Sequence, residues 1–401
     1  MPVYWIWFAQ LKGLSLRQKQ RLLEAFHDPE ELYHAEQRKL PEEVISALEA
    51  KDLTEARQIL YRCNQRCIRI LTYGDESYPV RLRSIEDPPV LLYYKGNLPQ
   101  WQAQPIIGVV GTRKASAYGL QTAHLLASQI AACGGLVVSG MAVGIDAMSM
   151  EGALDAGKST VGVLGGGVDV VYPATNRSLY RRTEANGCLL SEYPPGSRPL
   201  PYNFLQRNRI ISGLSDGVLV VEAPEKSGAL NTARHAFSQG RDMFAAPGNL
   251  GVDSCLGSNA LLQEGAYPAL GGWDVVKHYE NLYPKTVAKR TVSLQNSRPE
   301  TSAQVAQQPQ LPQSGREKME VSSQKSIDNR EESTYSVLNK RAVSLSKEET
   351  AVLELLSTVP QYPDAILDRA DLPAATVQSI LTRLSIKGLV CYQPDGRISR
   401  K

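Results

Sequence analysis

Short loops rich in glycine and serine recur in the middle of the chain, each directly after a short apolar segment. Backbone N–H groups in such loops, at the start of a helix, attract anions and phosphate above all. The first loop also carries Arg113, whose guanidinium group can bind phosphate with two hydrogen bonds. The residues expected to bind in these loops are Gly111, Thr112, Arg113, Ser139, Gly140, Gly144, Gly166, Ser227 and Gly228.

Two further stretches add candidate binding residues. Arg177 and Tyr180 lie three residues apart and would share one face of a helix, and Arg207, Asn208 and Arg209 form a basic stretch. Arginine binds phosphate, and an aromatic ring offers a flat surface for an unpaired base. The combination favours single-stranded nucleic acid over duplex. The alternative is that each arginine forms a surface ion pair, which is the commoner outcome for any single arginine.

The segments between the loops alternate between strand and helix patterns. Residues 106–110 predict a strand, the apolar spacing over 118–133 predicts a helix, and 136–138 predicts a second strand. The same alternation continues to about residue 280. It predicts an α/β fold whose parallel sheet is covered on both faces and binds ligands at the carboxyl ends of its strands. The loop of a single strand–loop–helix unit fits an ordinary turn equally well. Several such loops that converge at one edge of the sheet favour a binding site.

Two stretches match the residue patterns of catalytic motifs, but the secondary structure expected around them does not fit. Residues 152–159 (GALDAGKS) match the P-loop, which needs a strand before it and a helix after it. Here a helix is expected before Gly157 and a strand after Lys158. Residues 213–217 (GLSDG) match the nucleophile elbow in the same inverted order. We therefore expect neither nucleotide binding at Lys158 nor a serine nucleophile.

Three carboxylates follow the strand-end loops: Asp146, Asp169 and Glu222. We expect them to orient the loops by accepting hydrogen bonds from backbone N–H groups, with acid–base chemistry as the alternative. The five histidines and six cysteines form no pattern typical of a catalytic or zinc site. The sequence therefore predicts a protein without catalysis, metal or cofactor.

The composition gives only broad limits. A net charge of +3 over 401 residues does not by itself indicate a partner. The scattered cysteines predict a reduced, cytoplasmic protein. No apolar run reaches membrane-spanning length, and the first ten residues lack the basic leader of a signal peptide, so we expect no membrane association.

The sequence predicts a central domain at 71–284, with one smaller domain before it and another after it. Residues 1–70 predict a helical domain, with short helices around Gly13 and a long helix over 42–64. This pattern resembles a SAM or helix-hairpin-helix domain, which can bind a DNA backbone, and a bundle that serves contacts between domains fits equally well.

The C-terminal part divides into a linker and a compact unit. Residues 285–342 are poor in apolar residues and rich in Gln, Ser and Pro, which predicts a disordered linker. Residues 343–401 predict three helices and a β-hairpin, the pattern of a winged-helix domain. Its third helix, with Arg383 and Lys387 near its end, would read a DNA groove, and binding of a partner protein is the equal alternative.

Seven motifs in order resemble the DNA-processing protein A family (DprA/Smf). They cover about residues 70–285. The resemblance implies an extended Rossmann fold that forms a homodimer and binds single-stranded DNA. It also implies protection of incoming strands and loading of the RecA recombinase during natural transformation, without catalysis. The motifs are GVVGTR (108–113), SGMAVGID (139–146), GVLGGGVDVVYPATN (162–176), SEYPPG (191–196), QRNRIISGLSDGVLVVEA (206–223), SGALNTARHA (227–236) and GRDMFAAPGN (240–249).

The chain departs from the family pattern at three places. Val143 stands where the family usually has arginine, and Met148–Met150 where it usually has histidine. Leu205 replaces the proline of F-P-x-R-N-R, although Arg207 and Arg209 are kept. Losing a cation at position 143 weakens DNA binding unless another basic residue compensates.

Two other functions remain open. One is a nucleotide or nucleoside-phosphate hydrolase on a Rossmann variant, similar to the cytokinin-activating phosphoribohydrolases. Those enzymes have P-G-G-x-G-T followed by a glutamate, whereas residues 227–233 here contain no acid, which argues against hydrolysis. The other is a dimeric scaffold that binds partner proteins through the winged helix.

Overall fold

The computed structural model describes residues 1–36, 45, 48 and 51–290, together with parts of 347–400. The chain divides into two compact units, residues 1–301 and 302–401. Among the described helices, none combines the length and the apolar character needed to cross a membrane.

The first unit is built on a nine-stranded sheet with the strand order β1-β2-β6-β5-β4-β3-β7-β8-β9. All neighbours from β6 to β9 pair parallel, while β1 and β2 are added antiparallel at the β6 edge. The predicted parallel α/β sheet is therefore confirmed. The strands are β1 Arg69–Thr72, β2 Leu91–Gly96, β3 Ile106–Val110, β4 Leu136–Ser139, β5 Thr160–Leu164, β6 Cys188–Ser191, β7 Gly217–Val220, β8 Asp242–Ala245 and β9 Tyr267–Pro268.

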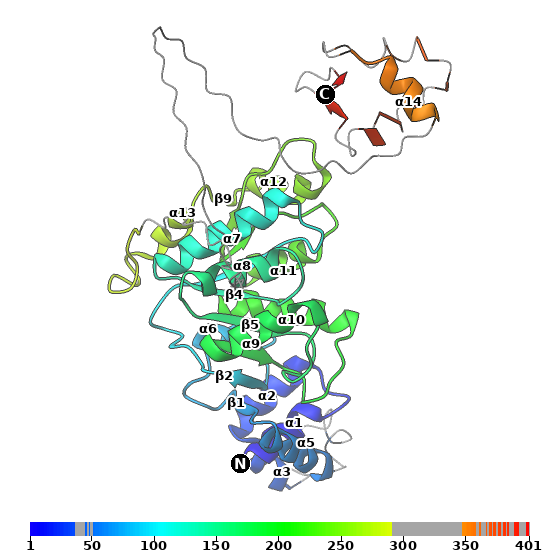
Figure 1. Cartoon of the computed structure of the whole chain (residues 1–401). Coiled ribbons are helices and arrows are strands. Elements are labelled where there is room, and N and C mark those ends of the chain that lie inside the picture. The colour runs from blue at the N-terminus through cyan, green and yellow to red at the C-terminus, as the bar shows by residue number, and fades with distance from the viewer. Residues whose placement is uncertain are drawn as a thin grey trace, which may run out of the picture. The chain divides into compact units, whose positions relative to one another are not determined.

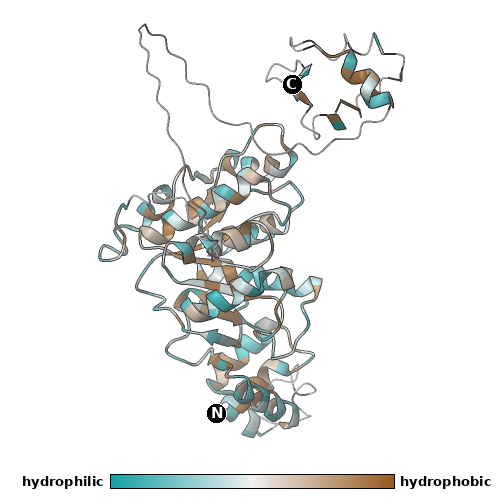
Figure 2. Ribbon diagram, viewed as in Figure 1, coloured by the Kyte–Doolittle hydropathy of each residue, from teal (hydrophilic) through white to brown (hydrophobic). Residues whose placement is uncertain are grey.

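Helices cover both faces of this sheet (Figure 1). The strands β3 to β7 are buried, and alternate residues point to opposite faces, so Val137 packs on one side while Leu136 and Val138 pack on the other. On the Val137 side lie α7 Ala117–Ala132, α8 Ile145–Asp155, α9 Arg177–Asn186 and α13 Gly272–Val276. On the other side lie α6 Val80–Arg83, α10 Pro201–Leu214, α11 Gly228–Ser238 and α12 Leu256–Gln263. The hydropathy of the ribbon follows this layering, with brown strands between helices of mixed colour (Figure 2).

Both misleading motifs lie where the sequence predicted. Residues 152–159 run from the end of α8 into β5, and residues 213–217 run from α10 into β7. Gly152 is a glycine because α8 crosses α7 there: a Cβ would lie 2.3 Å from the backbone oxygen of His124. The glycine therefore serves helix packing and not phosphate binding.

The N-terminal helices continue the first unit at the β1 edge (Figure 1). The core of these helices contains Trp5, Phe8 and Ile59 and extends to Tyr93 of β2 and Leu189 of β6. The turn before α2 is closed by a capping box of Ser15 and Gln18. The helices are α1 Pro2–Gln10, α2 Leu16–Phe26, α3 Pro29–His34 and α5 Thr54–Gln65.

The single helix predicted over residues 42–64 is wrong at its centre. Residues 51–53 are not helical, and α5 begins at Thr54. The carboxylate of Asp52 accepts hydrogen bonds from the backbone nitrogen and Oγ1 of Thr54, at 2.8 and 2.7 Å. This local turn competes with continuous helix and starts a new one.

The second unit contains helix α14 Lys347–Glu354 and an antiparallel hairpin, β10 Val390–Tyr392 and β11 Ile398–Arg400. Its described core residues include Val352, Val377 and Leu381. Arg383 lies 3.4 Å from Glu349 through Nε.

The disordered linker was predicted over 285–342, but its first residues, 285–290, are described and pack on the first unit, with Val287 buried and the nitrogen of Ala288 donating to the oxygen of Cys133. Residues 291–342 and Lys387 lie outside the described residues.

Candidate nucleic-acid interface

The strand-end loops meet at the carboxyl edge of the sheet and are tied together by backbone hydrogen bonds. The nitrogen of Thr112 donates to the oxygen of Glu222, and the nitrogen of Ile145 donates to the oxygen of Thr112, at 2.7 and 3.3 Å. A Cβ on Gly111 would lie 2.4 Å from Ile145 Cγ1, and one on Gly144 would lie 2.4 Å from the oxygen of Thr112. Both glycines are therefore required by loop packing, and Gly144, with a φ of 82°, starts α8.

A carboxylate fills the position at which this loop was expected to bind phosphate. The buried side chain of Glu222 lies at the N-terminus of α7 and accepts hydrogen bonds from the backbone nitrogen and Oγ of Ser116, at 3.2 and 2.8 Å. A Cβ on Gly119 would lie 1.7 Å from Glu222 Oε2. The helix terminus thus already holds an internal anion, and a phosphate there would meet a like charge.

The other two strand-end carboxylates also orient loops, as the sequence predicted. Asp169 accepts a hydrogen bond from the backbone nitrogen of Gly196 at 2.9 Å and pairs with Arg66 of the N-terminal helices. Asp146 is buried and accepts from the backbone nitrogen of Ala142 at 3.4 Å. Each of the three carboxylates is therefore engaged in contacts within the protein.

Arg207 was expected to bind phosphate, but its side chain is buried with 3% exposure. Its Nη1 donates to the backbone oxygen of Gly140 at 2.6 Å and to that of Val163. Burial raises the pKa of the Asp146 carboxyl, and the charge of Arg207 opposes that shift. Burial also lowers the pKa of Arg207, with Asp146 opposing. Arg207 therefore supports the loop after β4 from inside the protein.

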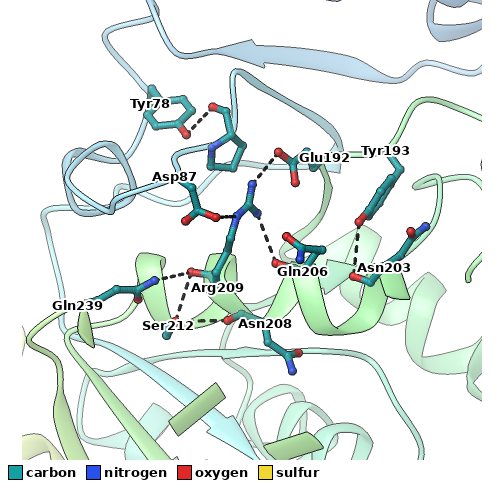
Figure 3. Close-up of polar contacts among 11 residues, drawn as sticks. Tyr78, Asp87, Glu192, Tyr193, Asn203, Gln206, Asn208, Arg209, Ser212 and Gln239 are labelled. Atoms are coloured by element: carbon teal, nitrogen blue, oxygen red, sulfur yellow. Dashed lines mark hydrogen bonds and ion pairs between the residues drawn. The ribbon is translucent and has the colours of Figure 1, made fainter. Parts of the chain in front are cut away.

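Arg209 is buried as well, with 1% exposure. Its Nε and Nη2 pair with Asp87 and Glu192, each at 2.8 Å, and Figure 3 shows the side chain reaching from α10 between these two carboxylates. Burial lowers the pKa of Arg209, but the charges of Glu192 and Asp87 outweigh this effect and raise the pKa above its ordinary value. The guanidinium group of Arg209 thereby links α10 to the segments that carry Asp87 and Glu192.

Arg177 and Tyr180 both lie on α9, three residues apart, but they differ in exposure. Arg177 is exposed at the start of α9, whereas Tyr180 is 5% exposed. The Tyr180 hydroxyl donates to the backbone oxygen of Tyr172 at 2.9 Å and accepts from its nitrogen at 3.3 Å. Tyr180 therefore positions Tyr172 and offers no ring to a ligand.

The remaining predicted residues form the framework of this edge. Ser139 is buried and donates to the oxygen of Val109 at 2.6 Å. The oxygen of Gly166 accepts from Ser191 Oγ at 2.7 Å. Ser227 caps α11, while Asn208 Nδ2 donates to the oxygen of the exposed Gly228 at 3.2 Å. Of the predicted side chains, Arg113 and Arg177 are the two long cations that face solvent.

Three side chains form what we call the stacking row: Arg113, Phe204 and Tyr172. The guanidinium carbon of Arg113 lies 5.1 Å from the centre of the Phe204 ring, which lies 5.6 Å from the centre of the Tyr172 ring. Tyr172 is 45% exposed. The row joins residues from the loop after β3, from α10 and from the segment before α9, and it combines a cation with open aromatic surface.

Sequence reasoning missed both aromatic members of the row and several cations around it. The quoted family motifs contain Tyr172, and Phe204 begins the stretch compared with F-P-x-R-N-R, which was the available signal. Lys114 and Arg198 are exposed in the loops after β3 and β6. Among the described residues, no three His, Cys, Asp or Glu side chains are grouped so that they could hold a metal ion.

Comparison with known proteins identifies relatives for most of the chain. The family model described as DNA recombination-mediator protein A matches residues 69–280, and the model described as DprA winged helix domain matches 339–396. The latter supports the predicted winged-helix domain.

Individual relatives agree with these matches. The DNA processing protein DprA of Bacillus subtilis is 40% identical over 230 residues, which are 57% of this chain and 76% of that protein. Protein Smf of Synechocystis is 37% identical over 276 residues, 66% of this chain and 69% of that protein. The X-ray structure of DNA processing protein A from Streptococcus pneumoniae has a TM-score of 0.61 at 32% identity and covers 69% of this chain and 98% of that one.

Removal of the buried charge of Arg209 tests its structural role. We expect Arg209→Met to lower the free energy of unfolding by about 2–3 kcal/mol, because Asp87 and Glu192 lose their partner while remaining partly solvated. Urea denaturation followed by circular dichroism measures this change. Arg177→Ala, at an exposed arginine, should change stability by less than about 0.5 kcal/mol. Equal stability of the Arg209→Met variant and the wild type would contradict the assignment.

Proposed function

The chain belongs to the DNA recombination-mediator protein A family, as its motifs predicted, and we propose that it binds single-stranded DNA through the stacking row without catalysing a reaction. The stacking row is the observation that carries this proposal. Aromatic faces stack on unpaired bases, whereas the bases of a duplex are already stacked on one another. An exposed cation and two aromatic rings in contact favour a strand whose bases are free.

Exposed cations flank the row and supply the contacts to phosphate. Lys114, Arg177 and Arg198 are exposed at the same edge of the sheet, and none of them forms an ion pair with another described residue. Such groups bind a phosphate backbone independently of sequence and release counterions. They can compensate for the valine at position 143.

The position of Glu222 argues against the nucleotide hydrolase. A Rossmann unit binds the phosphates of a nucleotide at the N-terminus of its first helix, and that place is taken here by the Glu222 carboxylate. The strand-end carboxylates are engaged by N–H groups and arginines, so no general base is free among them. We therefore keep the non-catalytic function.

A salt titration tests the proposal. We expect Arg113→Ala to weaken binding of a fluorescent oligothymidine about five- to tenfold at low salt. It should also make the salt slope shallower by about 0.7, because one phosphate contact is lost. Lys277→Ala, which removes a lysine paired with Asp274, should bind as the wild type does. Duplex DNA should compete poorly.

The same salt titration distinguishes the stacking contact of Phe204 from the phosphate contact of Arg113. Phe204→Leu should weaken binding by about 1–3 kcal/mol with an unchanged salt slope, because a stacking contact releases no counterion. A slope change equal to that of Arg113→Ala would mean that Phe204 acts through its cationic neighbour. Failure of the wild type to bind the oligothymidine would overturn the proposed function.

We further propose that the protein acts in the cytoplasm during natural transformation, where it protects incoming strands and loads RecA onto them. The family description, a recombination mediator, supports this role. In an assay of RecA assembly on single strands coated by a strand-binding protein, the wild type should shorten the lag and Arg113→Ala should not. An unchanged lag with the wild type would contradict loading.

We also propose a homodimer formed through the groove between α11, α12 and β8. This groove has a volume of about 710 Å³, and its lining includes Leu230, Met243 and Leu261. Phe237 also lines the groove and is 82% exposed. The groove also carries Arg234 and Glu264, so that two-fold pairing of copies can place each charge opposite its counterpart and each Phe237 in the other copy's groove.

Sedimentation tests this dimer face. Phe237→Glu should sediment as a monomer at concentrations at which the wild type is a dimer, because a carboxylate would replace the ring that packs against Leu230, Met243 and Leu261 of the other copy. Leu282→Glu is the matched control, since Leu282 is 70% exposed and does not line the groove. Equal masses for wild type and Phe237→Glu would rule out this face.

A further inference from the structure

A polar pocket lies at the amino-terminal edge of the sheet, at the opposite ends of the strands from the stacking row. Its volume is about 240 Å³, and it opens where the chain enters β3, β4 and β5. The residues that matter for its chemistry are Gln104, Lys158, Ser159, Lys285, Thr286 and Arg290.

The pocket concentrates positive charge. Lys158, Lys285 and Arg290 line it, and its lining contains no carboxylate. Within the described part of the chain, none of the three forms an ion pair. Three unpaired cations around one small volume repel one another, and an anion between them removes that cost.

Backbone contacts fix the segments that carry these cations. A Cβ on Gly134, whose φ is 99°, would lie 2.2 Å from the oxygen of Thr286, so residues 285–287 pack closely against the turn before β4. The nitrogen of Ala288 donates to the oxygen of Cys133 at 3.2 Å, and Thr286 Oγ1 donates to the oxygen of Ala103 at 2.7 Å. The nitrogen of Lys158 donates to the oxygen of Ala153 at 3.1 Å. The pocket is therefore held in shape by the fold.

We propose that this pocket binds a phosphate group of a phosphate ester. Arginine grips phosphate with two donors, lysine acts as a point charge, and the Ser159 hydroxyl supplies a neutral donor. No aromatic residue lines the pocket, so a base cannot stack there, and recognition is limited to the phosphate and its sugar. Lys158 and Ser159 are the last two residues of the P-loop look-alike, and they act here at the start of a strand without a helix terminus.

The phosphate ester can come from two sources. One is the backbone of a DNA strand that extends from the stacking row to the opposite edge, and this source rests on the proposed function. The other is a free nucleotide, which is independent of it. AMP and oligothymidines of two lengths, one just long enough for the row and one several times longer, separate the two sources.

The test compares the double variant Lys158→Ala/Lys285→Ala with the control Lys277→Ala/Lys289→Ala. Lys277 and Lys289 are exposed and do not line the pocket, and the control loses the same two positive charges, so it controls for net charge. For the DNA source, we expect the double variant to bind the long oligothymidine about fivefold more weakly at low salt. Its salt slope should be shallower by about 1.4 for two lost contacts, and binding of the short strand should be unchanged.

For the nucleotide source, calorimetry should show AMP binding to Arg113→Ala, in which the row is weakened, and no AMP binding after Lys158→Ala/Lys285→Ala is added. The proposal is overturned if the double variant matches the control Lys277→Ala/Lys289→Ala with both probes, or if short and long strands are weakened alike. If the wild type binds no oligothymidine, the proposed function fails, and the AMP titration still decides the pocket. Thermal unfolding checks that the variants remain folded.

Discussion

The hydrogen bonds between the Glu222 carboxylate and Ser116 determine how the carboxyl edge of the sheet can be used. They place an internal anion at the N-terminus of α7, where a Rossmann unit otherwise accepts phosphate. Gly119 must then be a glycine, because a Cβ would collide with the same carboxylate. Phosphate is thereby excluded from this helix terminus, and the proposed contacts move to the stacking row, in which Arg113 and Tyr172 are exposed and Phe204 is partly buried.

Helix α10 presents Phe204 to this edge while its arginines hold it in place. Arg207 donates to backbone oxygens after β4 and at β5, and Arg209 joins Asp87 and Glu192. Arg207 and Arg209 therefore make their contacts inside the protein and do not reach a nucleic acid at the surface. A rigid platform lowers the ordering cost of binding, which suits the proposed binding of many different strands by their shared chemistry.

The sheet and its order of loops could be predicted because apolar periodicity and glycine positions are local properties of the sequence. It was harder to predict which side chains face solvent. Arg207 and Arg209 belong to a residue type that usually reaches solvent, yet packing against neighbouring segments buries both. Phe204 and Tyr172 were missed for the opposite reason, since aromatic residues usually enter the core. The side of a helix that faces solvent depends on contacts between segments far apart in the chain, which no local pattern contains.

Photo-crosslinking with a bromouracil-substituted single strand tests most directly whether the strand lies on the stacking row. We predict that the crosslinked peptides contain Phe204 or Tyr172, and that Phe204→Leu reduces the yield at its own peptide while the protein remains folded. Crosslinks confined to α11 and α12, with none at Phe204 or Tyr172, would contradict the account.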